Sequence, residues 1–184
     1  MLGYEDEVWW SRLAQPRLCA WADKEETVRL QEHAAERTDH EPKALACYGL
    51  LRMDTKAMLL RFVEGRPLSS VTTQFLAWCC ERLAEEGKRV LVLVWDNAAW
   101  HVSREVRTWI KAHNRAAKAE GGVRILVCRL PTKSPWLNPI EPKWVHGKRQ
   151  VCAADRKLSG AELKQRICDY YRCELLDPLA NQVA

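Results

Sequence analysis

The alternation of apolar and polar side chains near the amino terminus predicts a strand over residues 2–10. Four alternate positions of this strand share one face: Leu2, Tyr4, Asp6 and Val8. Asp6 therefore points to the same side as apolar residues, whereas Glu5 and Glu7 point to the opposite side. A carboxylate on an apolar face needs a chemical reason, so Asp6 is a candidate functional residue.

The next part of the chain predicts irregular structure and then a hairpin. A short strand is expected at residues 18–22, and the charge-rich segment 23–41 fits a helix and a solvated loop equally well. Residues 43–52 and 56–63 are two apolar runs on either side of a polar turn, and a Gly-Arg-Pro sequence follows them. That pattern predicts two antiparallel strands joined by a tight turn.

Apolar residues spaced three and four apart predict helices further along the chain. Residues 69–86 show this spacing, with a serine to cap the first turn and Gly87 to end the helix. Residues 103–119 predict a second helix, and the chain from Asn138 onward predicts a third. A capping box that begins at Ser159 opens a last helix.

Two further runs are apolar without alternation, as in strands that are buried on both faces. They are residues 89–95 and 123–128. The order of strand, hairpin, helix, buried strand, helix, buried strand and helices predicts an α/β fold with a mixed central sheet and helices on both faces. Because 184 residues with 47% apolar content are enough for one good core, a single domain over residues 1–184 is expected.

Composition and charge narrow the function. No run approaches the roughly 20 apolar residues of a membrane span, and the first residues lack the features of a secretion signal, so a cytoplasmic protein without a membrane partner is expected. The eight cysteines form no CxxC pair, which gives little support for a zinc site or a disulfide framework. Of the net charge of +5, most gathers in residues 129–150, where five basic residues face one glutamate. This segment suits an anionic partner.

Two other carboxylates follow predicted sheet elements. Asp96 comes directly after the buried run 89–95, at the edge where open α/β sheets hold catalytic groups, although a turn residue would explain it alone. Glu141 is at the third helical position if Asn138 caps that helix, and a favourable charge at a helix start would explain it alone. The strand at 123–128, which comes before the helix of Glu141, should run parallel to the strand at 89–95 and end at the same edge of the sheet. Asp96 and Glu141 should therefore converge at that edge.

Three convergent carboxylates suit a site for divalent cations. Asp6, Asp96 and Glu141 would offer the oxygen ligands that Mg²⁺ prefers, and two ions about 4 Å apart clamp the attacking and leaving oxygens of a phosphodiester. Glu5 and Glu7 are rivals to Asp6 for the first position. An ion pair with a nearby lysine or arginine would be a simpler explanation of Asp6.

Several other side chains are candidates for contact with DNA. His101 suits the orientation of a water or contact with a phosphate, and a solvent-facing loop histidine is an equal alternative. Trp136 suits stacking on unpaired bases, and core packing is an equal alternative. A basic set suits phosphate neutralisation, with a solvated helix face as the alternative: Lys133, Lys143, Lys148 and Arg149. Other tryptophans are expected in the core: Trp9, Trp78 and Trp109.

Two strings in the sequence carry a family resemblance. Residues 95–101 read Trp-Asp-Asn-Ala-Ala-Trp-His, and residues 134–144 read Ser-Pro-Trp-Leu-Asn-Pro-Ile-Glu-Pro-Lys-Trp. Together they resemble the signature of mariner-like bacterial insertion-sequence transposases of the DDE superfamily. The resemblance implies an RNase H-like fold in which three residues are catalytic and hold two Mg²⁺ or Mn²⁺ ions: Asp6, Asp96 and Glu141.

The same resemblance implies an activity and partners. Metal-dependent hydrolysis at transposon ends, followed by strand transfer into target DNA, is expected in a dimeric complex in the bacterial nucleoid. An RNase H-like nuclease or resolvase without strand transfer, and a non-catalytic DNA-binding remnant, are the alternatives. Thr132 and Lys133 depart from the proline-tyrosine pair of many relatives. The family's helix-turn-helix region does not precede Asp6, so a fragment is expected, with a separate polypeptide as a source of that region.

Overall fold

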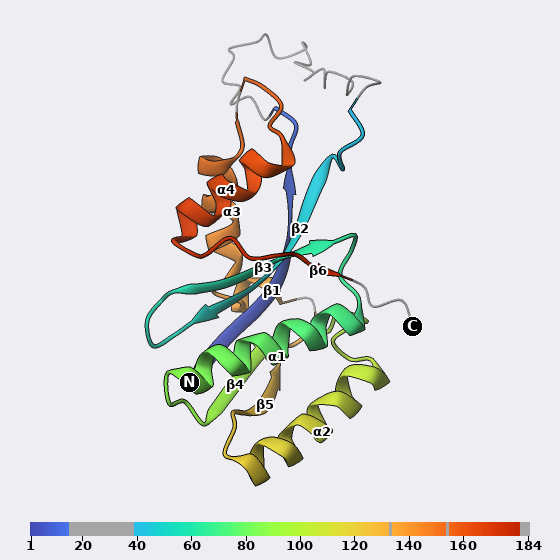
Figure 1. The fold of residues 1–184 in the computed structure, drawn as a ribbon, viewed down its shortest axis with the longest axis vertical. Coiled ribbons are helices and arrows are strands. Elements are labelled where there is room, and N and C mark those ends of the chain that lie inside the picture. The colour runs from blue at the N-terminus through green and yellow to red at the C-terminus, as the bar shows by residue number, and fades with distance from the viewer. Residues whose placement is uncertain (15–38, 133, 154, 181–184) are drawn as a thin grey trace.

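A six-stranded mixed sheet forms the centre of the fold (Figure 1). The protein is described by a computed structural model that covers residues 1–14, 39–132, 134–153 and 155–180. The strands lie in the order β5-β4-β1-β2-β3-β6. They are β1 (Leu2–Ser11), β2 (Ala44–Arg52), β3 (Met58–Glu64), β4 (Val90–Trp95), β5 (Arg124–Arg129) and β6 (Leu179–Ala180).

The strand directions combine a hairpin with parallel crossovers. β2 is antiparallel to both β1 and β3, which confirms the predicted hairpin. β1, β4 and β5 run parallel to one another, as β3 does to β6. The carboxyl ends of β4 and β5 therefore open on the same edge of the sheet, which is where open α/β sheets hold ligands.

Helices cover both faces of the sheet, as predicted (Figure 1). Within the described residues, α1 (Ser69–Glu85) and α2 (Arg104–Glu120) pack on one face, and α3 (Glu141–Val151) and α4 (Gly160–Tyr171) pack on the other. A short 3-10 helix, η1 (Pro135–Leu137), precedes α3. None of the helices in the described part of the chain is long and apolar enough to cross a membrane.

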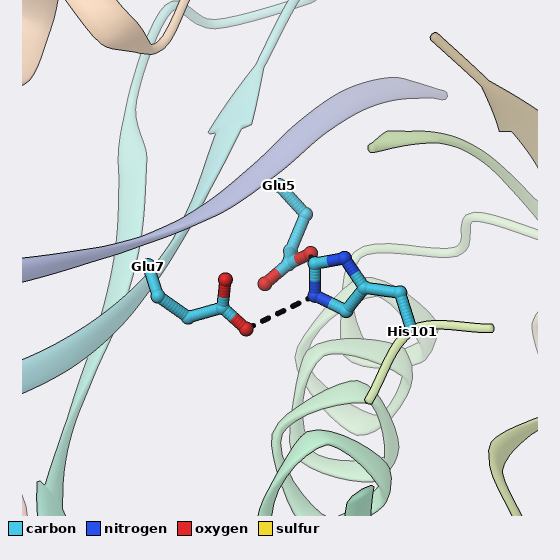
Figure 2. A group of neighbouring side chains, drawn as sticks. All are labelled: Glu5, Glu7 and His101. Atoms are coloured by element: carbon cyan, nitrogen blue, oxygen red, sulfur yellow. Dashed lines mark hydrogen bonds and ion pairs between the residues drawn. The ribbon is translucent and has the colours of Figure 1, made fainter. Parts of the chain in front are cut away.

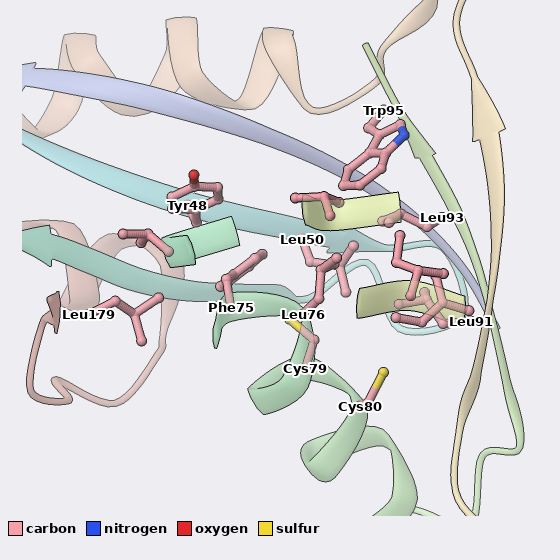
Figure 3. Packing of buried hydrophobic residues seen from close by; sticks show 14 of the residues in the cluster. Tyr48, Leu50, Phe75, Leu76, Cys79, Cys80, Leu91, Leu93, Trp95 and Leu179 are labelled. Atoms are coloured by element: carbon pink, nitrogen blue, oxygen red, sulfur yellow. The ribbon is translucent and has the colours of Figure 1, made fainter. Parts of the chain in front are cut away.

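The core under α1 and α2 contains side chains from the β2–β3 hairpin and from β4 (Figure 3). No residue of β4 is exposed, and β4 lies between β5 and β1, which confirms the prediction that this strand is covered on both faces. Its apolar run is explained by the need to fill space on both faces. Large side chains of this core include Tyr48, Leu50, Phe75, Leu76, Leu91 and Leu93.

A second core lies on the opposite face, under α3 and α4. Val8 and Trp10 of β1 contribute to it, so the face of β1 that carries Asp6 is apolar as predicted. Trp144 of α3 packs edge-on against Trp10, with ring centroids 6.1 Å apart. The first strand thus contributes apolar side chains to this second core, while its buried side chain on the opposite face is the carboxylate of Glu5.

The prediction that residues 123–128 form a strand buried on both faces is wrong. β5 is an edge strand, and Ile125 is its only buried residue. Leu126 and Val127 are 54% and 39% exposed. Apolar composition indicated burial, but the chain returns through α2 to the outside of β4, where no further strand of the described residues covers it.

Two predicted helix starts also need correction. No serine caps α1, because Leu68 occupies the N-cap position without a side-chain hydrogen bond. α3 begins at Glu141 itself with Ile140 at its N-cap, so Glu141 is the first helical residue and not the third. Asn138 does not cap α3, since its side-chain amide donates instead to the backbone oxygen of Glu5 (3.3 Å).

Other predicted boundaries hold. Ser103 caps α2 by accepting from the backbone N–H of Val106, and Ser159 caps α4 by accepting from that of Glu162. Gly87 follows α1 with a φ of 73°, a conformation that glycine tolerates best. The strand predicted at residues 18–22 and most of the segment 23–41 lie outside the described residues.

Candidate active site

The three carboxylates singled out by the sequence line one cleft of about 390 Å³. Asp6 comes from β1, Asp96 follows β4 directly, and Glu141 is the first residue of α3. Asn97 and Ala98 after β4 also line it, together with residues between β5 and α3 such as Thr132, Ser134 and Asn138. The structure brings together residues that are far apart in the sequence, while their chemical role stays a prediction.

Sheet register explains why Asp6 and Asp96 meet. The parallel pairing of β1 with β4 places Tyr4 opposite Val94, so two residues further along each chain come Asp6 and Asp96. Glu141 is brought to them by the segment before α3, which the Asn138 amide ties to the Glu5 backbone. Backbone register and one buried amide therefore shape the cleft.

Asp6 is a partly buried carboxylate with a single side-chain donor. Oδ2 accepts a hydrogen bond from Nε1 of Trp144 at 2.9 Å. Burial, then the charges of Glu141 and Glu7, raise the pKa of Asp6 to about 7 against the opposing effect of the Trp144 hydrogen bond. Among the described residues, no ion pair joins Asp6 or Glu141 to a lysine or arginine, so the simpler explanation of Asp6 finds no support.

This excess of negative charge is the observation that fits a divalent cation. Clustered carboxylates that lack basic partners need protons or metal ions to offset their repulsion. The side chains of Asp6, Asp96 and Glu141 offer only oxygen, the ligand that Mg²⁺ and Mn²⁺ prefer. The donor set of the cleft thus matches the expected ions.

Asp96 combines a turn role with exposure to the cleft. Its Oδ1 accepts from the backbone N–H of Ala98 and lies 2.8 Å from Nδ1 of His101. The His101 contact lowers the pKa of Asp96, despite the partial burial of the carboxylate. Since the side chain is still 54% exposed, its role in the turn leaves it accessible from the cleft, and its chemical role stays a prediction.

His101 is buried, which corrects the expectation of a solvent-facing or phosphate-contacting side chain. It is 1% exposed, and its ring stacks on Trp95 with centroids 4.4 Å apart. Nδ1 meets Asp96, and Nε2 lies 3.0 Å from Oε1 of Glu7 (Figure 2). Because both of its nitrogens contact carboxylates and its side chain is buried, His101 helps to orient Asp96 and does not reach the surface.

Glu5 and Glu7 form a second acidic cluster with His101, on the face of β1 opposite Asp6. Among the described residues, these three form the only group of potential metal ligands whose donor atoms all lie within 4.8 Å of one another. Burial, then the charge of Glu7, raises the pKa of Glu5 well above its usual range. Burial lowers the pKa of His101, but Glu5, Asp96 and Glu7 outweigh it and raise that pKa to about 11.

The sequence contained only part of the signal for this second cluster. Strand alternation puts Glu5 and Glu7 on one face, and by sequence alone each was an alternative to Asp6 as the first carboxylate of the site. The partner, His101, lies 94 residues from Glu7, so no local pattern could join them. Trp100 adds a further contact by donating its Nε1–H to Oε1 of Glu7 at 2.6 Å.

The candidates for DNA contact have different surroundings. Trp136 is 75% exposed, which excludes core packing, and Lys143 is exposed on the first turn of α3. Lys148 is partly buried, and Arg149 lines a separate hollow of about 550 Å³. Lys133 lies outside the described residues.

A second hollow of about 390 Å³ adjoins Asp6, Glu7 and Asp96, and the sequence did not reveal it. Trp9 lines it and is 46% exposed, so its assignment to the core is wrong. Arg66, just after β3, lines it as well and supplies a positive charge. Trp78 and Trp109 do pack against the core.

Comparisons with known proteins agree with this architecture. A family model described as "DDE superfamily endonuclease" matches residues 3–164. The structure of the Mos1 transposase paired-end complex with the left transposon end matches with a TM-score of 0.66 and 16% identity, over 94% of this chain and 48% of that chain. The catalytic domain of the Mos1 mariner transposase matches with a TM-score of 0.61 and 14% identity, over 94% and 70%.

A Mos1 paired end complex with Mg also matches, with a TM-score of 0.63 and 17% identity, over 92% of this chain and 47% of that chain. The chain thus spans about half the length of the transposase chains in the paired-end complexes. At these identities the likeness shows the fold, which is RNase H-like as predicted. A comparison with curated protein sequences finds no match.

Proposed function

This chain belongs to the DDE superfamily of endonucleases, and from that premise we propose that it is the catalytic domain of a DNA transposase. Its reaction would be hydrolysis of a phosphodiester at a transposon end, followed by in-line attack of the freed 3′-hydroxyl on target DNA. The observation that carries the proposal is the single cleft lined by Asp6, Asp96 and Glu141.

The proposed cofactor is a pair of Mg²⁺ or Mn²⁺ ions. Asp6, Asp96 and Glu141 are the residues that would hold them. When bound, the ions would neutralise charge on the phosphodiester and favour deprotonation of the attacking water or hydroxyl. Support comes from the oxygen-only donor set of the cleft and from the related Mos1 complexes with Mg and with Mn.

The protein's own contribution is to position these carboxylates. Trp144 fixes one oxygen of Asp6, and His101 with the Ala98 backbone fixes one oxygen of Asp96. Because those oxygens already have donors, the carboxylates keep one orientation in a cleft that is open to DNA. Such preorganisation lowers the cost of aligning reactants.

DNA would be held by side chains around the cleft. Lys143 and Arg66 are exposed and suit contact with phosphates, while Trp136 and Trp9 suit stacking on bases. The related Mos1 structures are complexes with transposon ends, and by that likeness we propose transposon-end and target DNA as substrates. A homodimeric synaptic complex, and a separate polypeptide with a helix-turn-helix, are part of the same proposal.

Incubation of the protein with supercoiled plasmid and Mg²⁺ or Mn²⁺ tests the activity. Nicked circles should accumulate with the wild type, and the double variant Asp6→Asn/Glu141→Gln should produce none. Strand-joined products from a transposon-end duplex separate a transposase from a nuclease or resolvase. If the folded wild type nicks nothing with either metal, the catalytic proposal is wrong and a DNA-binding role takes its place.

A further inference from the structure

The cluster of Glu5, Glu7 and His101 is separate from the cleft that holds Asp6 and Glu141. Adjacent residues of a strand point to opposite faces, so Glu5 and Glu7 lie across β1 from Asp6. Figure 2 shows both carboxylates directed at the imidazole ring of His101. Nε2 of His101 lies 3.0 Å from Oε1 of Glu7 and 3.3 Å from Oε2 of Glu5.

Glu5 is a buried carboxylate that lacks hydrogen bonds. It is 0% exposed, and neither of its oxygens accepts a hydrogen bond from any residue that the structure describes. Buried carboxylates are normally paired, hydrogen-bonded or bound to a metal, because their burial is otherwise costly. Contact with His101 is its nearest compensation, so a cation bound between these side chains would offset the charge of Glu5.

The hydrogen bond between His101 and Asp96 determines which nitrogen of His101 faces Glu5 and Glu7. An ionised carboxylate only accepts hydrogen bonds, so Nδ1 of His101 must donate to Oδ1 of Asp96. Nε2 of His101 faces the oxygens of Glu5 and Glu7. A proton on Nε2 offsets their charge when no metal is bound, and a metal ion that binds there takes the place of that proton.

The distances suit a shared metal ion. Two ligand atoms bound to the same ion at about 2.1 Å lie roughly 3.0–3.4 Å apart in octahedral or tetrahedral geometry. The Nε2 contacts with Glu7 and Glu5 fall in that range at 3.0 and 3.3 Å. The Nδ1–H bond to Asp96 is also the outer-shell arrangement that orients a metal-binding histidine.

The ligand atoms of the cluster indicate which ion would bind, and the adjoining hollow gives a route to it. One imidazole with two carboxylates suits Zn²⁺ or Mn²⁺ better than Mg²⁺, which seldom takes nitrogen ligands. Glu7 lines the hollow that also contains Arg66 and Trp100, so an ion could reach the cluster from that side. We propose that Glu5, Glu7 and His101 bind one divalent transition-metal ion, in addition to the ions of the proposed catalytic cleft.

This ion would have a structural and positioning role. His101 would connect it to Asp96, so loading the site would fix the carboxylate that follows β4. The proposal does not depend on catalysis, since it concerns residues on the other face of β1. It can therefore be tested on a protein in which two of the three proposed catalytic carboxylates, Asp6 and Glu141, have been replaced.

The test uses Mn²⁺ as the probe and the double variant Asp6→Asn/Glu141→Gln, which keeps Asp96 to orient His101. One Mn²⁺ should bind per chain, and electron spin echo spectroscopy should detect coupling to an imidazole ¹⁴N. Added Zn²⁺ should displace it. Glu7→Gln in this background should weaken Mn²⁺ binding at least tenfold, and His101→Gln should remove the ¹⁴N coupling.

His146→Gln is the matched control, because His146 is an exposed histidine outside the cluster and its loss should leave the coupling intact. Absence of ¹⁴N coupling in the Mn²⁺-saturated wild type and double variant would overturn the proposal, and that measurement needs no variant of the cluster to fold. Coupling that survives His101→Gln would overturn it as well. Plasmid nicking by the wild type is scored separately, so failure of either proposal is distinguishable from failure of the other.

Discussion

Trp144 donates its indole N–H to Asp6 across 2.9 Å and thereby joins β1 to α3 over 138 residues of sequence. The ring lies against Gly49, the residue of β2 that pairs with Asp6. Because Glu141 begins the same helix, the contact also fixes the start of α3 relative to the first strand. One buried aromatic side chain therefore sets the relative position of two cleft carboxylates.

Trp144→Phe should separate this positioning role from packing. The phenyl ring keeps most of the apolar volume but cannot donate to Asp6, so the free energy of unfolding should fall by only about 1–2 kcal/mol. Loss of a partner that orients a metal ligand typically lowers metal affinity or activity by about 10–100-fold. We expect a decrease of that size in Mn²⁺-dependent plasmid nicking.

Trp78→Phe is the matched control, since Trp78 packs against the other core, away from the cleft. It should change stability by a similar amount and leave the nicking rate near that of the wild type. If Trp144→Phe nicks at the wild-type rate, the bond to Asp6 does not position a working carboxylate.

Gly49→Ala should destabilise the fold through the same contact. A Cβ at Gly49 would lie 2.4 Å from the ring of Trp144, closer than any tolerated contact. Overpacking of this kind costs about 1–3 kcal/mol, which denaturant unfolding measures. Gly3→Ala is the comparison, because its closest contact is the flexible end of Leu50 at 2.8 Å; equal losses for both variants would contradict the account.

Asp96→Asn should abolish nicking while it preserves the fold. The asparagine oxygen can still accept from the Ala98 N–H, so the turn after β4 should survive, but a negative charge that would bind cations is lost. Affinity for DNA should be unchanged or higher, because that charge also repels phosphate. Gel-shift and nicking assays on the same preparation decide the matter, and nicking at the wild-type rate would leave Asp96 as a turn residue alone.

Removal of the two exposed charges beside the cleft should weaken DNA binding without regard to sequence. In Lys143→Ala/Arg66→Ala, the slope of log affinity against log salt should become shallower by about two if each residue meets one phosphate. Binding to a transposon-end duplex and to a scrambled duplex should fall equally. Lys111→Ala/Arg115→Ala on α2 is the control, and a matching loss there would place the DNA elsewhere.

Local patterns in the sequence were enough for much of this protein. Alternation along β1 put Asp6 on the face of Val8 and Trp10, since side-chain direction in a strand depends only on position. Ser103 and Ser159 predicted two helix starts, because a capping hydroxyl bonds to a backbone N–H three residues away. The burial of β4 on both faces followed from its unbroken apolar run.

Only the tertiary structure decided the rest, because it depends on contacts between distant segments. Apolar composition could not show that β5 lies at the sheet edge, since burial is decided by what packs outside the strand. Nor could the residues around His101 reveal its burial between Asp96 and Glu7, as Glu7 lies 94 positions earlier. The sequence predicted which side chains would carry the chemistry; the register of β1 against β4 and the docking of α3 on β1 decided which of them meet.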